Sequence, residues 1–268
     1  MILNEILIQK RKEVEELKLR YPLRRLEEAV LARNGSSHRD FRKALSDSHR
    51  INLIAEIKKA SPSEGILREN FQPLRLAALF EYGGAAALSI LTETRFFKGR
   101  PSYLKTVRQV THIPILRKDF ILDEYQLYET KLLEADAVLL ISSLLTDEEL
   151  NHFISLSETL GLEALVEVHT EEDLKKAAGG GAKIIGVNNR SLQTLEVDVN
   201  RAERLLTHLP KNTTVVIESG FKSHEEIMKY KSLGINAFLV GTSLMKAEDV
   251  VAKLQELGRG RSIGNAQG

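Results

Sequence analysis

The sequence predicts an α/β protein that folds as a (β/α)8, or TIM, barrel with an N-terminal helical extension. Its 268 residues are close to the roughly 250 that one such barrel needs. From residue 51 onwards, short apolar runs alternate at even spacing with longer amphipathic segments. In these runs the odd and the even positions are both apolar, which is typical of parallel strands covered on both faces. An open, doubly wound sheet is the alternative, but no Gly-x-Gly-x-x-Gly follows the first run, as a dinucleotide-binding sheet would require.

Residues 1–48 are expected to form the helical extension, packed on the barrel. Apolar residues recur there among dense charges, at Ile2, Ile6, Val14 and Leu17. This spacing predicts an amphipathic helix over residues 1–19. A second helix is expected near residues 22–32, and the polar stretch 33–38 then marks a break before the barrel.

Eight apolar runs supply the strands of a barrel domain expected over residues 49–258. The runs are Ile51–Ile57, Ala86–Leu91, Pro114–Leu116, Ala137–Ile141, Ala164–Val168, Ile184–Val187, Val215–Ile217 and Ala237–Val240. Helices are expected between them, among others at Leu74–Tyr82, Glu124–Glu134, Asp147–Leu160, Glu171–Ala178 and Ser223–Leu233. Capping signals open three of these helices, at Thr146, Thr170 and Ser223. Residues 259–268 are expected to be a flexible tail.

Composition excludes several classes of function. The 38 Lys and Arg residues nearly balance the 37 Asp and Glu, so no nucleic acid and no membrane is expected as a partner. The absence of cysteine rules out disulfides and thiolate metal sites, and the seven histidines lack metal-ligand spacing. The charged N-terminus does not resemble a signal peptide, and no apolar run approaches the ~18 residues of a membrane-spanning helix. We therefore expect a cytoplasmic protein without metal or cofactor.

Charged residues at the ends of the apolar runs are the candidate site, because barrel active sites lie at the carboxyl ends of the strands. Glu56 and Lys58 stand two apart in the first run and so share one face. A structural ion pair is the other interpretation of these two. Glu167 is embedded among apolar neighbours in the fifth run, where desolvation would raise its pKa towards that of a working general acid or base. His169 is expected to be an ordinary residue at a helix start.

Polar residues end the other runs as well. The third run ends in Arg117-Lys118-Asp119, which a solvated edge would also explain. The sixth ends in Asn188 and Arg190, and a guanidinium suits a carboxylate or phosphate. The seventh ends in Ser219-Gly220 and the eighth in Gly241-Thr242, which matches the phosphate site of many barrels. The pattern predicts chemistry by Lys, Glu and Asn side chains on a phosphorylated small molecule.

These strand ends resemble, in their order along the chain, those of the indole-3-glycerol phosphate synthase family of tryptophan biosynthesis. The most specific stretch is Ile54–Gly65, which reads Ile-Ala-Glu-Ile-Lys-Lys-Ala-Ser-Pro-Ser-Glu-Gly. Supporting matches are Leu116–Phe120, Val166–His169, Gly186–Arg190, Glu218–Gly220 and Leu239–Gly241. The resemblance implies a carbon–carbon lyase that converts 1-(2-carboxyphenylamino)-1-deoxyribulose 5-phosphate to indole-3-glycerol phosphate, CO2 and water.

The resemblance also implies residue roles. Lys118 matches the general acid that acts on the substrate carbonyl, and Glu167 matches a further acid/base. Glu56 and Lys58 match a pair that organises the site, with Lys58 near the anionic groups of the substrate. The matches around the substrate are Asn188, counted with the catalytic groups, and Arg190. The phosphate cradle is matched by Ser219, Gly220, Gly241 and Thr242 together with Ser61, and the apolar wall around the anthranilate ring by Phe97, Phe120 and Leu139.

Two departures from the family pattern concern Ser191, where aspartate is common, and Thr242, where serine is common. The first puts a contact to Arg190 in doubt, and the second keeps a hydroxyl. The chain ends in the glycine-rich stretch Gly258–Gly268 soon after the helix of the eighth strand. We expect a monomer without a fused isomerase domain.

Three alternative functions fit parts of the same sequence pattern. Another phosphate-binding barrel, phosphoribosylanthranilate isomerase, would want a Cys/Asp acid–base pair, and the chain has no cysteine. A Schiff-base aldolase would use Lys118 and would be trapped by borohydride. A non-catalytic phosphate-binding scaffold would not need the acid–base residues that are all present.

Overall fold

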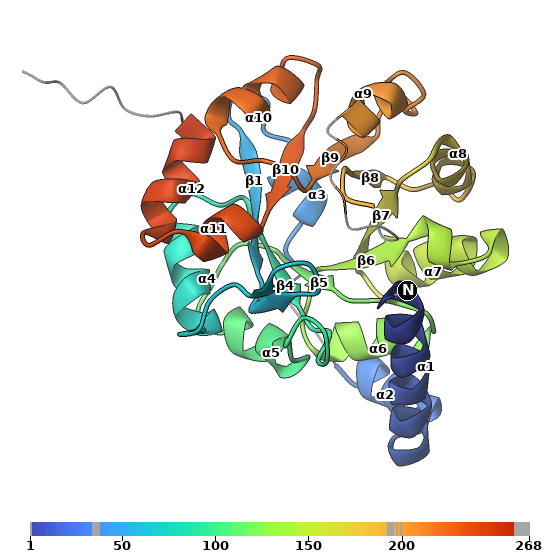
Figure 1. Ribbon diagram of the computed structural model, residues 1–268. Coiled ribbons are helices and arrows are strands. Elements are labelled where there is room, and N and C mark those ends of the chain that lie inside the picture. The colour runs from blue at the N-terminus through green and yellow to red at the C-terminus, as the bar shows by residue number, and fades with distance from the viewer. Residues whose placement is uncertain (1, 34–37, 192–195, 197, 199, 260–268) are drawn as a thin grey trace, which may run out of the picture.

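The protein is a closed barrel of eight parallel strands surrounded by helices (Figure 1). The computed structural model describes residues 2–33, 38–191, 196, 198 and 200–259. The strands are β1 (Asn52–Ile57), β4 (Ala87–Leu91), β5 (Ile115–Lys118), β6 (Ala137–Ile141), β7 (Glu163–Val168), β8 (Ile184–Asn188), β9 (Thr214–Glu218) and β10 (Ala237–Val240). Their order around the barrel is β1-β10-β9-β8-β7-β6-β5-β4, and β4 pairs back with β1. Every predicted run is a strand, so the TIM-barrel prediction is confirmed and the open sheet is excluded.

Helices follow the strands and lie on the outside of the barrel. They are α4 (Pro73–Tyr82), α5 (Ser102–Arg108), α6 (Tyr125–Leu132), α7 (Asp147–Thr159), α8 (Glu171–Gly179), α9 (Asn200–Leu206), α10 (His224–Lys231), α11 (Thr242–Lys246) and α12 (Val250–Arg259), with a short 3-10 turn η1 (Ser142–Leu144). The three predicted caps are confirmed, because Thr146, Thr170 and Ser223 each form a reciprocal capping box with the residue three positions on. A two-residue hairpin, β2 (Ala60–Ser61) with β3 (Gly65–Ile66), lies in the loop after β1.

The N-terminal segment forms α1 (Ile2–Arg20), α2 (Leu23–Leu31) and α3 (Phe41–Ala44). Helix α1 buries Ile6, Lys10 and Val14, and both α1 and α2 lie against α6 at one side of the barrel (Figure 1). The helices predicted for this segment are therefore present and packed on the barrel. The exact domain boundaries at residues 48 and 258 stay a prediction.

Strand residues alternate between two apolar cores. In β1, Leu53, Ala55 and Ile57 pack with the helices, whereas Ile54 belongs to the core inside the barrel. In β5, Leu116 likewise points inward. Since side chains two apart share a face, the residue two positions after each inward apolar residue also points inward. The inward rows therefore bring polar residues to the mouth of the barrel.

Outward-facing charges fasten β5 to the helices around it. Arg117 is 2% exposed, and its guanidinium contacts Glu129 of α6 at 2.7 Å and Asp119 at 3.2 Å. The other oxygen of Asp119 lies 3.0 Å from the Nζ of Lys10 on α1. Burial alone would lower the pKa of Lys10, but the carboxylates of Asp119 and Glu13 raise it above its ordinary value. The interpretation of Arg117 and Asp119 as a solvated edge is wrong, because both are buried.

Within the described residues, no helix combines the length and the apolarity needed to cross a bilayer. The predicted flexible tail lies outside the described residues from position 260 onwards, and Arg259 ends α12.

We expect Lys10→Ala to lower the free energy of unfolding by about 3 kcal/mol, because it leaves the buried Asp119 with only part of its charge compensation. Lys12→Ala is the matched control: Lys12 pairs with Glu16 at 3.9 Å on the exposed face of the same helix. That variant should lose less than about 0.5 kcal/mol. Chemical denaturation measures both, and equal losses would contradict the assignment of Lys10 as an anchor of the extension.

Candidate active site

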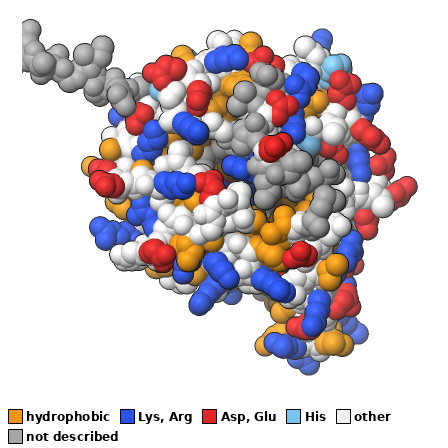
Figure 2. All heavy atoms as spheres, in the orientation of Figure 1, with side chains coloured by type: hydrophobic (Ala, Val, Ile, Leu, Met, Phe, Trp, Pro, Cys, Tyr) orange, Lys and Arg blue, Asp and Glu red, His pale blue; other side chains and the backbone are white. Residues whose placement is uncertain are grey.

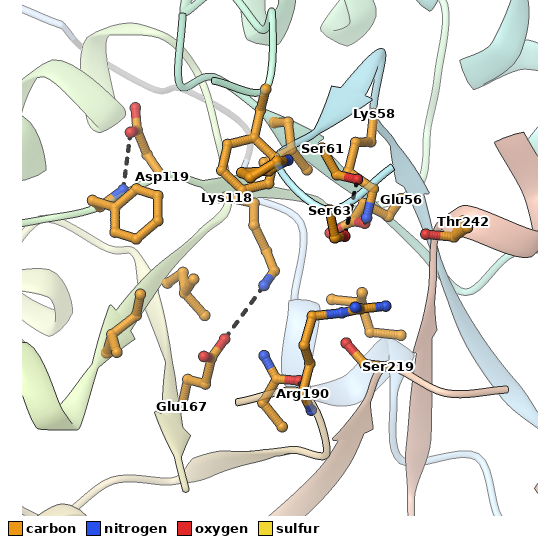
Figure 3. A pocket seen from close by; sticks show the side chains of 18 of the residues that line it. Glu56, Lys58, Ser61, Ser63, Lys118, Asp119, Glu167, Arg190, Ser219 and Thr242 are labelled. Atoms are coloured by element: carbon orange, nitrogen blue, oxygen red, sulfur yellow. Dashed lines mark hydrogen bonds and ion pairs between the residues drawn. The ribbon is translucent and has the colours of Figure 1, made fainter. Parts of the chain in front are cut away.

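A pocket at the carboxyl ends of the strands gathers the residues predicted from the sequence (Figure 3). Twelve of them line its main part, and Gly220 and Gly241 line an adjoining part. The two parts share Glu56, Lys58, Arg190, Ser219, Leu239 and Thr242. The barrel closure therefore brings together side chains that are up to about 190 positions apart in the sequence.

Lys118 lies at the centre of the buried charges. It is the last residue of β5 and follows the inward-facing Leu116 by two positions. Its Nζ lies 3.0 Å from Glu218 Oε2 and 3.4 Å from Glu167 Oε2. Figure 3 shows the Lys118 side chain reaching across the pocket towards Glu167, while Asp119 lies apart from them. One ammonium is thus shared by carboxylates from two other strands, β7 and β9.

This sharing sets the charge of Lys118 and Glu167. Burial alone would lower the pKa of Lys118, but the carboxylates of Glu218, Glu167 and Glu56 hold it well above its ordinary value. Burial alone would raise the pKa of Glu167, but the Lys118 ammonium, His169 and the Asn188 amide hold it below its ordinary range. The expectation of a raised pKa for Glu167 is therefore wrong, because the neighbouring cation outweighs desolvation.

Glu218 is the carboxylate that has the raised pKa. Burial raises the pKa of Glu218 to about 8, and the negative charges of Glu167 and Glu56 add to this against the attraction of Lys118. The sequence contained the signal: Glu218 follows the inward-facing Val216 by two positions, as Glu167 follows Leu165. Glu218 lies in the family-like stretch Glu218–Gly220 but was not predicted as a site residue.

Glu56 and Lys58 form an ion pair of 2.5 Å inside the pocket. Burial alone would raise the pKa of Glu56, but Lys58 and Lys118 hold it below its ordinary value. The structural interpretation of this pair and the functional one are therefore compatible. Glu56 is 4% exposed and anchors Lys58, whose side chain lines both parts of the pocket.

Two glycines make room for these carboxylates. A Cβ at Gly186 would lie 2.2 Å from Glu218 Oε1, and a Cβ at Gly241 would lie 2.1 Å from Glu56 Oε2. A side chain at either position would therefore have to displace the carboxyl group beside it. Gly241, predicted as part of a phosphate cradle, thus also admits Glu56, and Gly186 was not predicted from the sequence.

Asn188 and Arg190 continue the pocket at the end of β8. The Asn188 Oδ1 accepts a hydrogen bond of 2.9 Å from the Arg190 backbone N–H, and its side chain also hydrogen-bonds Glu167. Asn188 thus connects the base of the pocket to the loop that carries Arg190. His169 is more than a helix-start residue, because its Nε2 lies 3.3 Å from Glu167 Oε1.

An apolar wall closes one side of the pocket. Phe97 and Phe120 stand with ring centroids 6.2 Å apart, and Leu139 lines the same pocket. Figure 2 shows hydrophobic side chains gathered near the centre of the face seen in Figure 1, with charged side chains around them. A flat aromatic group could stack against such a wall.

The opposite side is polar and carries small residues. Ser219 and Gly220 follow β9 with φ angles of +68° and +100°, and Gly241 and Thr242 follow β10 at the start of α11. Lys222 and Lys246 also line this part of the pocket, together with Arg190. Small residues with nearby cations suit a phosphate group.

The site can therefore move protons between fixed positions. Lys118 stays protonated, Glu167 stays ionised and Glu218 keeps its proton at neutral pH. Within the described part of the chain, no three His, Asp or Glu side chains form a group that could hold a metal ion. Two proton donors, Lys118 and Glu218, and one proton acceptor, Glu167, thus lie between the apolar wall and the polar, cationic end of the pocket.

Solved structures with a similar fold include other barrels. The 3-hexulose-6-phosphate synthase of Salmonella typhimurium matches with a TM-score of 0.61 and 15% identity, covering 77% of this chain and 96% of that one. The N-acetylmannosamine-6-phosphate 2-epimerase of Clostridium perfringens matches with a TM-score of 0.59 and 16% identity, covering 79% and 93%. Such low identities support the fold alone.

Sequence comparison is more specific. The family model described as indole-3-glycerol phosphate synthase matches residues 3–257. Proteins named indole-3-glycerol phosphate synthase are 46% identical in Thermoanaerobacter pseudethanolicus, covering 96% of both chains, and 43% identical in Acetivibrio thermocellus, covering 96% of this chain and 98% of the relative. A third, from Campylobacter curvus, is 42% identical and covers 97% and 100%. This chain belongs to the indole-3-glycerol phosphate synthase family.

Proposed function

We propose that this protein converts 1-(2-carboxyphenylamino)-1-deoxyribulose 5-phosphate to indole-3-glycerol phosphate, CO2 and water. The observation that carries the proposal is the buried Lys118 ammonium between Glu167 and Glu218, set between an apolar wall and a cationic, small-residue end. The reaction needs proton donors and acceptors at one carbonyl, and its substrate carries an aromatic ring at one end and a phosphate at the other.

The two ends of the pocket support one orientation of the substrate. We assign the anthranilate ring to the wall of Phe97, Phe120 and Leu139. The phosphate is assigned to the polar end formed by Ser61, Ser219, Gly220, Gly241 and Thr242. Arg190 lines both parts of the pocket and is assigned to the anionic groups of the substrate. Binding energy from these remote groups then holds the reacting carbons together.

Lys118 is assigned to ring closure. The aromatic carbon that bears the carboxylate attacks the carbonyl carbon, a carbon–carbon bond forms, and the carbonyl oxygen takes up a proton. Lys118 enters this step as an ammonium, so it can stabilise the developing negative charge and then donate that proton to the oxygen. A Schiff-base aldolase would need the neutral amine, which the raised pKa of Lys118 disfavours.

The later steps use the carboxylates. When CO2 leaves, the bond between the ring and the carboxylate carbon breaks and its electrons return to the ring system. The new hydroxyl then departs as water with a donated proton, and a base removes the last proton to form the indole. Glu167 is ionised and suits the base, whereas Glu218 holds a proton at neutral pH and suits the donor.

Glu56, Lys58 and Asn188 are assigned to organising these groups. Lys58 is held by Glu56 at 2.5 Å and lines both parts of the pocket, which suits contact with an anionic substrate. Asn188 hydrogen-bonds Glu167 and so restricts the direction in which its carboxylate points.

We further propose a cytoplasmic enzyme that acts on this small phosphorylated substrate as a monomer. A reducing compartment suits the cysteine-free chain. Location and oligomeric state stay predictions.

Purified protein should form a fluorescent indole product from the carboxyphenylamino-deoxyribulose phosphate, with no added metal or cofactor. Borohydride added during turnover should leave the mass of the chain unchanged, because no covalent adduct forms. Absence of indole fluorescence would refute the proposed function, and a trapped adduct would favour the aldolase.

Lys118→Ala and Glu167→Gln should each lower kcat by at least ~10²-fold, the scale of general acid–base catalysis. Lys118→Arg keeps the positive charge, so this variant should stay folded. Its kcat should nevertheless be low, because an arginine has no accessible neutral form and cannot donate a proton. Lys58→Ala should raise KM as well as lower kcat. Circular dichroism controls for folding, and near-normal turnover in a folded variant would remove that residue from its assigned role.

The stability of the protein should depend on pH through Glu218. Its folded-state pKa of about 8 lies above the ordinary value of 4.5, so between these values the folded chain keeps a proton that the unfolded chain releases. The contribution of Glu218 to the free energy of unfolding therefore falls as the pH rises from 4.5 to about 8. Glu218→Gln is neutral at every pH and lacks this loss.

Urea denaturation at intervals from about pH 5 to pH 9 checks this dependence. The free energy of unfolding of Glu218→Gln, relative to the wild type, should rise up to about pH 8 and then level off. A difference that is the same at every pH would mean that Glu218 has no raised pKa in the folded protein.

A further inference from the structure

The loop between β4 and α5 is organised around one buried carboxylate that the proposed chemistry does not use. Glu93 is 2% exposed and stands two residues after the last residue of β4. Its Oε1 accepts a hydrogen bond of 2.9 Å from the backbone N–H of Arg95. Its Oε2 accepts bonds of 2.7 Å and 2.8 Å from the backbone N–H groups of Phe96 and Phe97.

The backbone of Glu93 closes the same loop. The N–H of Gly99 donates to the Glu93 carbonyl oxygen at 2.7 Å. A Cβ at Gly99 would lie 2.2 Å from the carbonyl oxygen of Leu91, so only glycine allows the loop to return this close to the strand. Both the side chain and the main chain of Glu93 thus hold one compact turn, and three of its bonds go to consecutive residues that end at Phe97.

Phe97 is the residue through which this turn reaches the pocket. It lines the main part of the pocket, and its ring stands 6.2 Å from that of Phe120. Its carbonyl oxygen accepts a hydrogen bond of 3.3 Å from Ala60, in the loop that carries Lys58 and Ser61. The position of Phe97 therefore affects both the aromatic wall and the loop after β1.

We propose that Glu93 is a positioning residue that determines how tightly the aromatic ring of the substrate is held, by fixing the loop that presents Phe97. This inference rests on the proposed function, in which Phe97 contacts the anthranilate ring. Glu93 itself is not among the residues that line the pocket, so it acts through Phe97 and touches no reacting atom. If the loop is already ordered before the substrate binds, less conformational entropy is lost on binding, and the substrate binds more tightly.

A matched control exists at the other end of the barrel. Glu81 also uses its carboxylate to hold a loop, accepting from Thr111 Oγ1 at 2.6 Å and from the backbone N–H of His112 at 3.0 Å. That loop leads from α5 into β5, on the side opposite the pocket. Glu81→Ala and Glu93→Ala both remove a loop-holding carboxylate, but only the second lies beside the site.

Steady-state kinetics of the full chain on the carboxyphenylamino-deoxyribulose phosphate tests the inference. Glu93→Ala should raise KM at least about tenfold and change kcat by less, since it weakens a contact made in both the ground state and the transition state. Glu93→Gln keeps one acceptor oxygen and should raise KM by an intermediate factor. Glu81→Ala should lower the thermal midpoint and leave KM and kcat as in the wild type.

A double-mutant cycle identifies the route of the effect. Phe97→Ala should raise KM by itself, and adding Glu93→Ala to it should raise KM little further, because the second change acts through the side chain already removed. If Glu93→Ala multiplies KM by the same factor in both backgrounds, the proposal is overturned. If Glu93→Ala does not fold, Glu93→Gln takes its place in the cycle with the same criteria.

The wild-type chain separates this inference from the proposed function. If the wild type forms no indole product, the proposed function is wrong and the inference falls with it. When the wild type turns over and the Glu93 variants share its KM, as Glu81→Ala should, the inference alone is refuted.

Discussion

The active site depends on one interaction, the sharing of the Lys118 ammonium by two buried carboxyl groups. Glu167 and Glu218 approach its Nζ at 3.4 Å and 3.0 Å and are each 1% exposed. Unpaired charges at such depth would be strongly unfavourable. With Glu56 and Lys58 included, three carboxylates face two ammonium groups, so the cluster approaches neutrality when one carboxyl keeps its proton. The raised pKa of Glu218, about 8, is consistent with this balance.

The rest of the barrel holds this cluster in place. Gly186 and Gly241 leave space for Glu218 and Glu56, where a Cβ would collide with the carboxylate oxygens. On the outer face of β5, Arg117 and Asp119 join the strand to α6 and, through Lys10, to α1. The N-terminal extension is therefore connected to the residues on either side of Lys118 in the sequence. Glu93 plays a similar part for the loop that carries Phe97.

Much of the fold and the membership of the site could be predicted from the sequence. The strands follow from runs that are apolar on both parities, and the capping boxes at Thr146, Thr170 and Ser223 from local chemistry. The alternation of side chains along a strand also indicated that Glu56 and Lys58 share a face. Alternation could not indicate which strand ends meet across the barrel, because that depends on how the barrel closes and on the register of its strands. The direction of the Glu167 pKa and the importance of Glu218 depend on their distances to Lys118, and so neither could be derived from spacing alone.

The proposed chemistry requires that Glu218 carries a proton at neutral pH while Glu167 does not. Carbon-13 NMR of protein labelled at the glutamate carboxyl carbons observes both groups directly, with Glu218→Gln and Glu167→Gln providing the assignments. One carboxyl resonance should titrate with a midpoint near pH 8 and be lost in Glu218→Gln. The Glu167 resonance should be that of an ionised carboxylate throughout this range. If every glutamate resonance instead titrates below about pH 6, near the ordinary values, the proposed division of proton donor and acceptor is wrong.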